Sequence, residues 1–242
     1  MLIAIAAALL SWEWVHLFGY RTRALPGLAV PVAVFAAGTL AVSEHSRAAL
    51  TLLVALWAVA WWTADRGRDV DGRGQPAGWL AAGVLYIGLA GIALIELRHD
   101  NAAGQANVLF LFLVVWASDI GAYMAGRLFG GPKIAPAVSP NKTWAGAAGG
   151  LAGAMLVGVA TAMLLAPGGA ARAAAVAAML GVMAQAGDLL ESRIKRRFEV
   201  KDSSSLIPGH GGLLDRLDGV LAAAPLAALL ALALGQGQPL WW

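Results

Sequence analysis

Apolar residues run along this chain in long stretches, and short polar connections separate them. About 20 apolar residues are the length that crosses the hydrocarbon core of a bilayer as an α-helix. Eight segments reach or approach this length: roughly 2–18, 24–42, 48–63, 77–97, 106–125, 144–166, 170–190 and 217–234. The pattern predicts an all-α fold, a polytopic integral membrane helical bundle of about eight transmembrane helices.

Composition agrees with this prediction. Hydrophobic residues make up 60% of the 242 positions and charged residues only 13%, whereas a soluble domain carries about 25% charged residues. The chain has no cysteine, which excludes a disulfide framework, a Cys-ligated zinc and a thiol nucleophile. There is no fixed-period repeat, so we expect one membrane-embedded domain over residues 1–242. Trp12, Glu13 and Trp14 interrupt the first apolar stretch, which also lacks a basic leading region, so we expect a mature helix rather than a cleaved signal peptide.

The basic residues predict the orientation. Of the 17 Lys and Arg residues, the first, third, fifth and seventh connections hold two, three, three and six, and the other connections hold one each. By the positive-inside rule the odd connections are cytoplasmic and both termini lie outside. The net charge of +3 therefore reports membrane orientation and does not indicate nucleic-acid binding. Trp241 and Trp242, beyond the last span, are typical of interfacial anchors.

Carboxylates within or beside these spans indicate where a functional site lies. A carboxylate in a membrane helix is costly and by default marks a cavity or an ion pathway. The predicted orientation brings several of them to the cytoplasmic face: Glu13, Asp119, Asp188, Asp215 and Asp218. Glu96 belongs to the opposite side, beside Arg98, and we expect it to be structural or solvated.

The seventh connection concentrates the remaining chemistry. Between Asp188 and Asp218 it combines a cluster of cations, a serine run, a Gly-His-Gly-Gly turn and an Asp-Arg-Leu-Asp helix start. Cations neutralise phosphoryl oxygens, glycines let backbone amides approach them, and carboxylates suit Mg²⁺. A basic juxtamembrane loop that only touches anionic lipid is the alternative; it explains the cations but neither the aspartates nor the glycines. The connection therefore indicates a phosphate-handling site.

This stretch resembles the signature of the phosphatidate cytidylyltransferases, also called CDP-diacylglycerol synthases. The matching positions are Ser192, Ile194, Lys195, Arg196, Lys201, Asp202, Ser204, Ile207, Pro208, His210, Gly211, Gly212, Leu213, Asp215, Arg216, Leu217 and Asp218. Two further stretches are similar to the family, an aspartate-bearing helix at 118–130 and a Ser-Pro-x-Lys-Thr block at 139–143. The family usually carries glutamate where Ala145 stands, and usually has a further hydrophobic segment before the Trp12-Glu13 pair. We expect either a late-assigned start or a lost helix.

The resemblance implies a membrane nucleotidyltransferase that joins CTP and phosphatidate into CDP-diacylglycerol and pyrophosphate in bacterial phospholipid synthesis. It also implies a Mg²⁺ cofactor, with a second cation left open, and a location in the inner membrane with the site facing the cytoplasm. The implied catalytic residues are Asp188, Asp215, Lys201 and Arg216, and the implied metal ligands are Asp188, Asp215, Asp218 and Asp119. The implied substrate-binding residues are Ser139, Lys142, Thr143, Arg196, Asp202, His210, Gly211 and Gly212.

The sequence alone leaves other interpretations of the function open. A CTP-dependent lipid or polyprenol kinase would use similar chemistry but transfer the γ-phosphoryl group. A transporter would place its polar residues near the bilayer midplane, often in two related halves, and this chain shows neither. A non-catalytic homologue is a third alternative because of Ala145. The bilayer is the expected surrounding, a homodimer is one expected assembly, and no nucleic-acid partner is expected.

Overall fold

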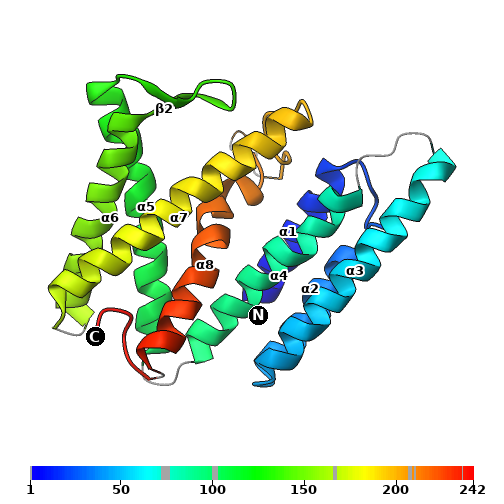
Figure 1. Ribbon diagram of the computed structural model, residues 1–242, viewed down its shortest axis with the longest axis horizontal. Helices are drawn as coiled ribbons and strands as arrows, with labels where there is room; N and C mark the ends of the chain where they lie inside the picture. Colours follow the sequence, from blue (N-terminus) through cyan, green and yellow to red (C-terminus); the bar gives the residue numbers. More distant parts are fainter. Residues whose placement is uncertain are drawn as a thin grey trace. The chain divides into compact units, whose positions relative to one another are not determined.

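The computed structural model describes residues 2–71, 77–99, 103–165, 168–206, 209, 211–235 and 237–242. In these residues it has eight helices and one short hairpin: α1 (Leu2–Leu17), α2 (Ala29–Val42), α3 (Ser46–Asp71), α4 (Ala77–His99), α5 (Gly104–Phe129), β1 (Lys133–Ala135), β2 (Ser139–Thr143), α6 (Trp144–Leu165), α7 (Ala170–Arg197) and α8 (Leu214–Leu234) (Figure 1). Six helices, α3 to α8, are long and apolar enough to cross a membrane, while α1 and α2 are shorter apolar helices. The predicted all-α membrane bundle is thereby confirmed.

The chain divides into two compact units, and each unit is made of two segments that are separate in the sequence. Unit 1 comprises Met1–Glu96 and Phe198–Leu217, and unit 2 comprises Leu97–Arg197 and Asp218–Trp242. The connection between α7 and α8 therefore belongs to unit 1, although most of the two helices it joins belongs to unit 2. The single domain predicted over 1–242 stays a prediction.

Unit 1 is built on small apolar residues. α2 packs against α1 and α3 through a fully buried core that includes Ala33, Ala37 and Leu53. α1 is tied to α4 by Trp14, whose indole Nε1 donates to the backbone oxygen of Trp79 at 3.1 Å. A Cβ on Gly83 would overlap the Trp14 ring, so glycine is what lets these two helices come together.

Unit 2 is a helical bundle in which α5 lies against α6 and α7 (Figure 1). A Cβ on Gly153 would lie 2.7 Å from the Ala117 oxygen, so the α5 and α6 backbones touch almost directly. The Gln185 amide donates to Ser118 Oγ at 3.3 Å and to the Ala147 oxygen at 3.2 Å. One side chain thus joins α7 to both neighbours, as polar groups in membrane bundles do.

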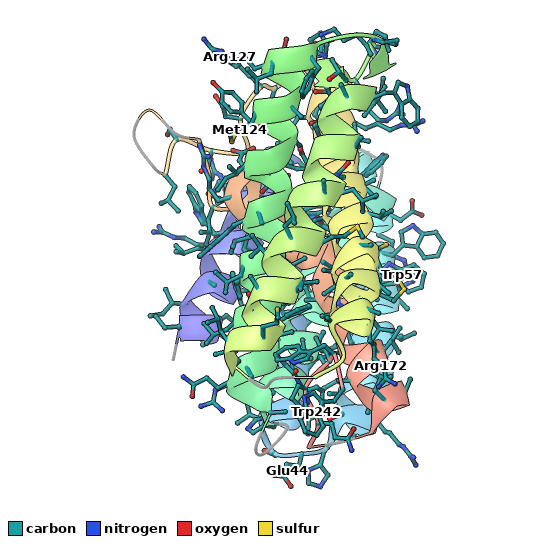
Figure 2. All side chains as sticks on the ribbon, turned by 90° about the vertical axis from the view of Figure 1, so that its left-hand side faces the viewer. Glu44, Trp57, Met124, Arg127, Arg172 and Trp242 are labelled. Carbon is teal, nitrogen blue, oxygen red and sulfur yellow. The ribbon has the colours of Figure 1, made fainter. Side chains whose placement is uncertain are left out.

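The two ends of unit 2 differ. Figure 2 shows Arg127 at one end and Arg172 with Trp242 at the other. At the second end the C-terminal residues fold back: Leu240 donates its amide to Asn107 Oδ1 at 2.9 Å, and Trp241 packs on Phe110 with ring centroids 4.8 Å apart. Trp241 is fully buried, so its prediction as an interfacial anchor is wrong, whereas Trp242 is exposed.

Element boundaries differ from the sequence prediction in several places. Residues 24–28 form a bend and a turn instead of the start of α2. A Cβ on Gly27 would collide with the Arg21 oxygen, so this turn requires glycine at that position. α3, α5 and α7 continue beyond their apolar stretches, since Arg, Lys and Glu are good helix formers outside lipid. The hairpin was not predicted; its strands are antiparallel, with Lys133 opposite Thr143 and Ala135 opposite Ser139.

Candidate active site

The α7–α8 connection in unit 1 begins at an aromatic anchor. Phe198, the first residue after α7, packs edge-on against Phe18 with ring centroids 4.6 Å apart, and against Trp79 at 5.9 Å. Aromatic pairs in this geometry add about 0.5–1.5 kcal/mol beyond the area they bury. Within unit 1, the first residue of the connection is therefore held against a residue of α4 and the residue that follows α1.

Asp215 organises the interior of the connection. Its Oδ2 accepts from the Gly212 amide at 2.8 Å, the Ser203 amide at 3.0 Å and the Ser203 hydroxyl at 3.0 Å. Asp215 lies in the first turn of α8 and reaches back three residues to Gly212, the geometry by which a first-turn carboxylate satisfies an amide at a helix start. Gly211 has φ +79°, and a Cβ there would lie 2.7 Å from Asp215 Oδ2, so glycine is required at this turn.

A second carboxylate, Glu13 of α1, reaches the same connection. Glu13 Oε1 accepts from the Leu213 amide at 2.8 Å and the Ser204 hydroxyl at 2.6 Å, and Oε2 accepts from the Leu214 amide at 2.6 Å. A Cβ on Gly212 would lie 2.6 Å from Glu13 Oε1 and would overlap Ser203 Oγ. The second glycine of the turn is thus needed for close packing of side chains within unit 1.

These contacts shape an open pocket of about 350 Å³ in unit 1. Its described lining is polar and consists of Lys201, Asp202, Ser204, Ser205, Gly209, Gly211 and Arg216. Lys201 and Arg216 are exposed at the pocket, so their charges are accessible to an anion from solvent. Two cations, two hydroxyls and glycine backbone match a phosphate-binding site.

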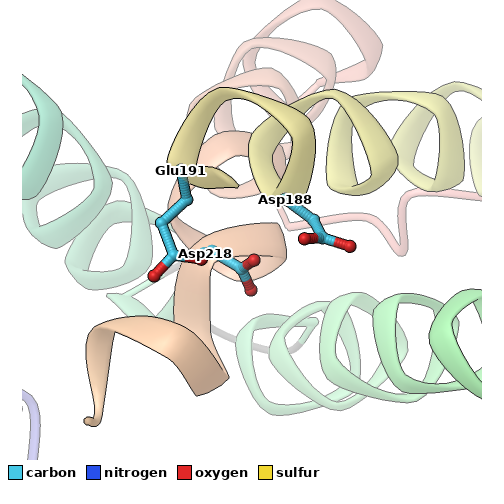
Figure 3. Close-up of side chains that lie close together, drawn as sticks. All are labelled: Asp188, Glu191 and Asp218. Atoms are coloured by element: carbon cyan, nitrogen blue, oxygen red, sulfur yellow. The ribbon is translucent and has the colours of Figure 1, made fainter. Parts of the chain in front are cut away.

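Unit 2 holds a cluster of acidic side chains. One oxygen each from Asp188, Glu191 and Asp218 lies within 4.8 Å of the other two. Asp188 and Glu191 come from α7 and Asp218 from α8, and their carboxylates point into one space (Figure 3). Glu191 and Asp218 are buried and Asp188 is half-buried. Hard oxygen ligands at this spacing suit Mg²⁺, which binds through one or two carboxylates and keeps its remaining positions for water and phosphate.

Cations balance this cluster. Lys142 of β2 forms an ion pair with Asp188, and Lys195 pairs with Glu191 at 3.0 Å along α7. Asp119 on α5 is within electrostatic reach of both Asp188 and Lys142. Arg196 Nε donates to the Val138 oxygen at 3.4 Å, so the hairpin is fastened to α7 by two cationic side chains.

The predicted site residues thus fall into two groups. The structure brings Asp188, Asp218, Asp119 and Lys142 together in unit 2, and it places Lys201, Asp202, Gly211 and Arg216 at the pocket of unit 1. Thr143 is buried and caps α6, since its hydroxyl accepts from the Gly146 amide at 3.0 Å. Ser139 begins β2, and Arg196 lies in the last turn of α7, where its Nε donates to the hairpin. Their roles toward substrate, and that of Asp215 toward a metal, stay predictions; His210 lies outside the described residues.

Sequence reasoning missed Glu191, Ser204 and Ser205 as site residues. Glu191 follows Asp188 by three positions, a spacing that puts both on one helix face, so this signal was present. The two serines belong to the noted serine run, but nothing in the sequence shows which serines face a pocket.

Six long apolar helices, a phosphate-type pocket and a buried carboxylate cluster define the class: an integral membrane protein equipped to handle nucleotide or lipid phosphates. The chain belongs to the cytidylyltransferase family, which matches residues 1–234. It is 42% identical over 232 residues to a phosphatidate cytidylyltransferase of Brucella suis, covering 94% of this chain and 81% of that protein. It is 35% identical over 255 residues to that of Pseudomonas aeruginosa, covering 99% and 89%. A Bacillus subtilis phosphatidate cytidylyltransferase is 38% identical over 157 residues, 64% of this chain.

Proposed function

We propose that this protein transfers cytidylate from CTP to phosphatidate and releases pyrophosphate. The observation that carries the proposal is the pocket of unit 1, where Lys201 and Arg216 face a glycine and serine backbone. The names of the relatives support cytidylyl transfer over the γ-phosphoryl transfer of a lipid kinase. They also support a role in phospholipid synthesis.

The reaction is an in-line displacement at phosphorus. An oxygen of the phosphatidate phosphate bonds to the α-phosphorus of CTP, and the bond from that phosphorus to the oxygen bridging the α- and β-phosphates breaks. A phosphate monoester with a second pKa near 6 is already ionised at neutral pH, so no general base is needed. The protein's part is positioning and charge neutralisation.

We assign these two tasks to the two groups of residues. Lys201 and Arg216 hold the triphosphate oxygens, and Arg216 suits a planar, bidentate contact with phosphate. Asp188 and Asp218, with Glu191 beside them, are the residues that would hold Mg²⁺. Mg²⁺ held there would supply positive charge to neutralise the charge that develops on the phosphoryl oxygens. Lys142 orients Asp188 and is a candidate for the lipid phosphate together with Ser139 and Arg196.

Asp215 is better supported as an organiser of the pocket than as a metal ligand. Its Oδ2 already accepts three hydrogen bonds from Ser203 and Gly212. These bonds hold the start of α8, which carries Arg216, against the serine run. Asp215 therefore acts on catalysis through the shape of the pocket.

We further propose that the protein lies in the bacterial inner membrane with both polar groups on the cytoplasmic side, where CTP is available. The excess of Lys and Arg in the odd connections supports this orientation. A homodimer and a second cation stay predictions.

The function is tested by product analysis on the purified full chain. With labelled CTP, phosphatidate and Mg²⁺, we expect a cytidylated lipid and pyrophosphate in equal amounts. CDP and a phosphorylated lipid would instead establish a kinase. Omitting phosphatidate or chelating Mg²⁺ is expected to abolish product formation.

A further inference from the structure

Glu13 is a buried charge that the proposed chemistry does not use. Its side chain is fully buried in α1, an apolar helix of unit 1. A charged group within the apolar part of a membrane protein is costly unless hydrogen bonds compensate it. Its partners therefore indicate why it is there.

Among the described residues, the donors to Glu13 are Ser204 and Leu213 of the α7–α8 connection and Leu214, the first residue of α8. The Leu213 and Leu214 amides, at 2.8 and 2.6 Å, are at the start of α8, where the first amides of a helix have no partner within the helix. A negative charge at this end is also favoured by the helix dipole. Glu13 of α1 thus accepts from the Leu213 and Leu214 amides, whereas Asp215 of α8 accepts from the Gly212 amide.

The third bond joins Glu13 to the pocket itself. Ser204 donates its hydroxyl to Glu13 Oε1 at 2.6 Å and also lines the pocket. Its neighbour Ser203 donates instead to Asp215. Two consecutive serines therefore face two different carboxylates, which sets the path of the backbone along the pocket wall.

Glu13 holds the pocket from two sides at once. One side is Ser204, and the other is the first turn of α8, which places Arg216. Gly212 lies between them and is packed so closely on Glu13 that no larger residue fits. One buried carboxylate consequently determines the separation of the hydroxyl and cationic walls.

We propose that Glu13 is a positioning residue for the CTP triphosphate, acting through Ser204 and the start of α8. The inference rests on the proposed function. In this role Glu13 neither contacts substrate nor transfers a proton.

The test compares Glu13→Gln, Ser204→Ala and the double variant in the full chain, with initial rates measured against CTP and against phosphatidate. Glutamine keeps the size of the side chain but turns an NH₂ group toward a donor. Because hydrogen bonds to a charged group contribute more than neutral ones, we expect the KM for CTP to rise about tenfold or more. The KM for phosphatidate is expected to change by less than about twofold.

The double variant separates positioning from a direct Ser204 contact. If Ser204 acts through Glu13, the double variant is no worse for CTP than Glu13→Gln alone. The proposal would be overturned if the two substitutions raised the KM for CTP independently, so that their effects multiply in the double variant. It would also be overturned if Glu13→Gln had the wild-type KM for CTP. If Glu13→Gln does not fold, Glu13→Asp, which keeps the charge but shortens the side chain, takes its place in both the single and the double variant. A raised KM for CTP in Glu13→Asp that adding Ser204→Ala does not raise further supports the proposal, and an unchanged KM for CTP in Glu13→Asp rejects it.

The chain offers a matched control. Glu96, also in unit 1, accepts a hydrogen bond from the Ser46 hydroxyl on another helix, so Glu96→Gln and Ser46→Ala break a similar pair away from the pocket. We expect both to leave the KM for CTP unchanged. If wild-type protein forms no cytidylated lipid, the proposed function fails; equilibrium dialysis of CTP against wild type and Glu13→Gln then still decides this inference.

Discussion

Ser203 and Asp215 close the connection that precedes α8: the amide and the hydroxyl of Ser203 both donate to Asp215 Oδ2 at 3.0 Å. Ser203 is buried, so these groups do not have solvent as an alternative partner. A lost acceptor would leave two donors unsatisfied, at a cost of about 1–3 kcal/mol each.

Asp215→Asn is expected to abolish cytidylate transfer while the protein still inserts into the membrane. The new NH₂ group would face the donors of Ser203 or Gly212, so the pocket wall moves. Transfer of label from CTP to lipid in isolated membranes, with immunoblotting for protein level, measures this. Substantial retained activity would remove Asp215 from the mechanism.

Asp188→Asn and Asp218→Asn are expected to raise the Mg²⁺ concentration needed for half-maximal activity. Removing even an outer-shell partner of a metal costs roughly 10- to 100-fold in affinity, and a direct ligand is expected to cost at least as much. Mg²⁺ titration of activity checks this, with Glu44→Gln as an acidic control outside the cluster. An unchanged titration curve for both variants would contradict the metal assignment.

The two lysines of the hairpin are expected to differ. Lys142 pairs with Asp188, so Lys142→Ala leaves that carboxylate without its cation and is expected to reduce activity by about tenfold or more. Lys133 is exposed on β1, and Lys133→Ala is expected to be mild. A complete loss of activity in Lys133→Ala would show that the proposed site is too small.

Gly212→Ala tests the close packing behind the pocket. The added Cβ meets Ser203 Oγ and Glu13 Oε1, and such overpacking costs about 1–3 kcal/mol. We expect a lower melting temperature and strongly reduced activity. Gly78→Ala in α4, where a Cβ meets no atom within 4 Å, serves as the control and is expected to be neutral or slightly stabilising. Equal effects of the two substitutions would argue against the packing account.

The C-terminal residues provide a test of stability away from the site. Trp241→Ala empties a fully buried position against Phe110 and is expected to cost about 3–5 kcal/mol. Trp242→Ala, at a side chain that is 51% exposed, is expected to change stability by less than about 0.5 kcal/mol. Thermal unfolding of the solubilised protein distinguishes them; similar melting temperatures for the two variants would be inconsistent with the packing of Trp241.

The helices were predictable because the length of an apolar stretch reports directly on a membrane span. The family was predictable from the residues of the α7–α8 connection, which lie within one stretch of sequence. The hairpin was not predictable, since Pro132 and Pro140 indicate a loop and the pairing depends on tertiary contacts. The buried place of Trp241 depends on Phe110, more than a hundred residues earlier, so no local pattern reveals it.

The candidate site was likewise predictable from the sequence only in part. The distribution of Lys and Arg predicted that five carboxylates lie at one face, and this stays a prediction. Within unit 2 the structure brings Asp188 and Asp218 together, and within unit 1 it places Glu13 and Asp215 on one connection. The sequence did not distinguish Asp215, which holds a backbone turn, from Asp218, which joins the acidic cluster. The two aspartates are three positions apart, and only the contacts of each side chain separate their roles.

The link between Glu13 and Leu213 joins residues 200 positions apart, which has a consequence for synthesis. At about 5–20 residues per second, roughly 10–40 s pass between translation of α1 and translation of the amides that satisfy its carboxylate. During that time the Glu13 carboxylate lacks the Leu213 and Leu214 amides that it accepts from in the folded chain. The pocket of unit 1 is therefore completed only after Leu214 has been translated, and a product truncated before that residue lacks these bonds to Glu13.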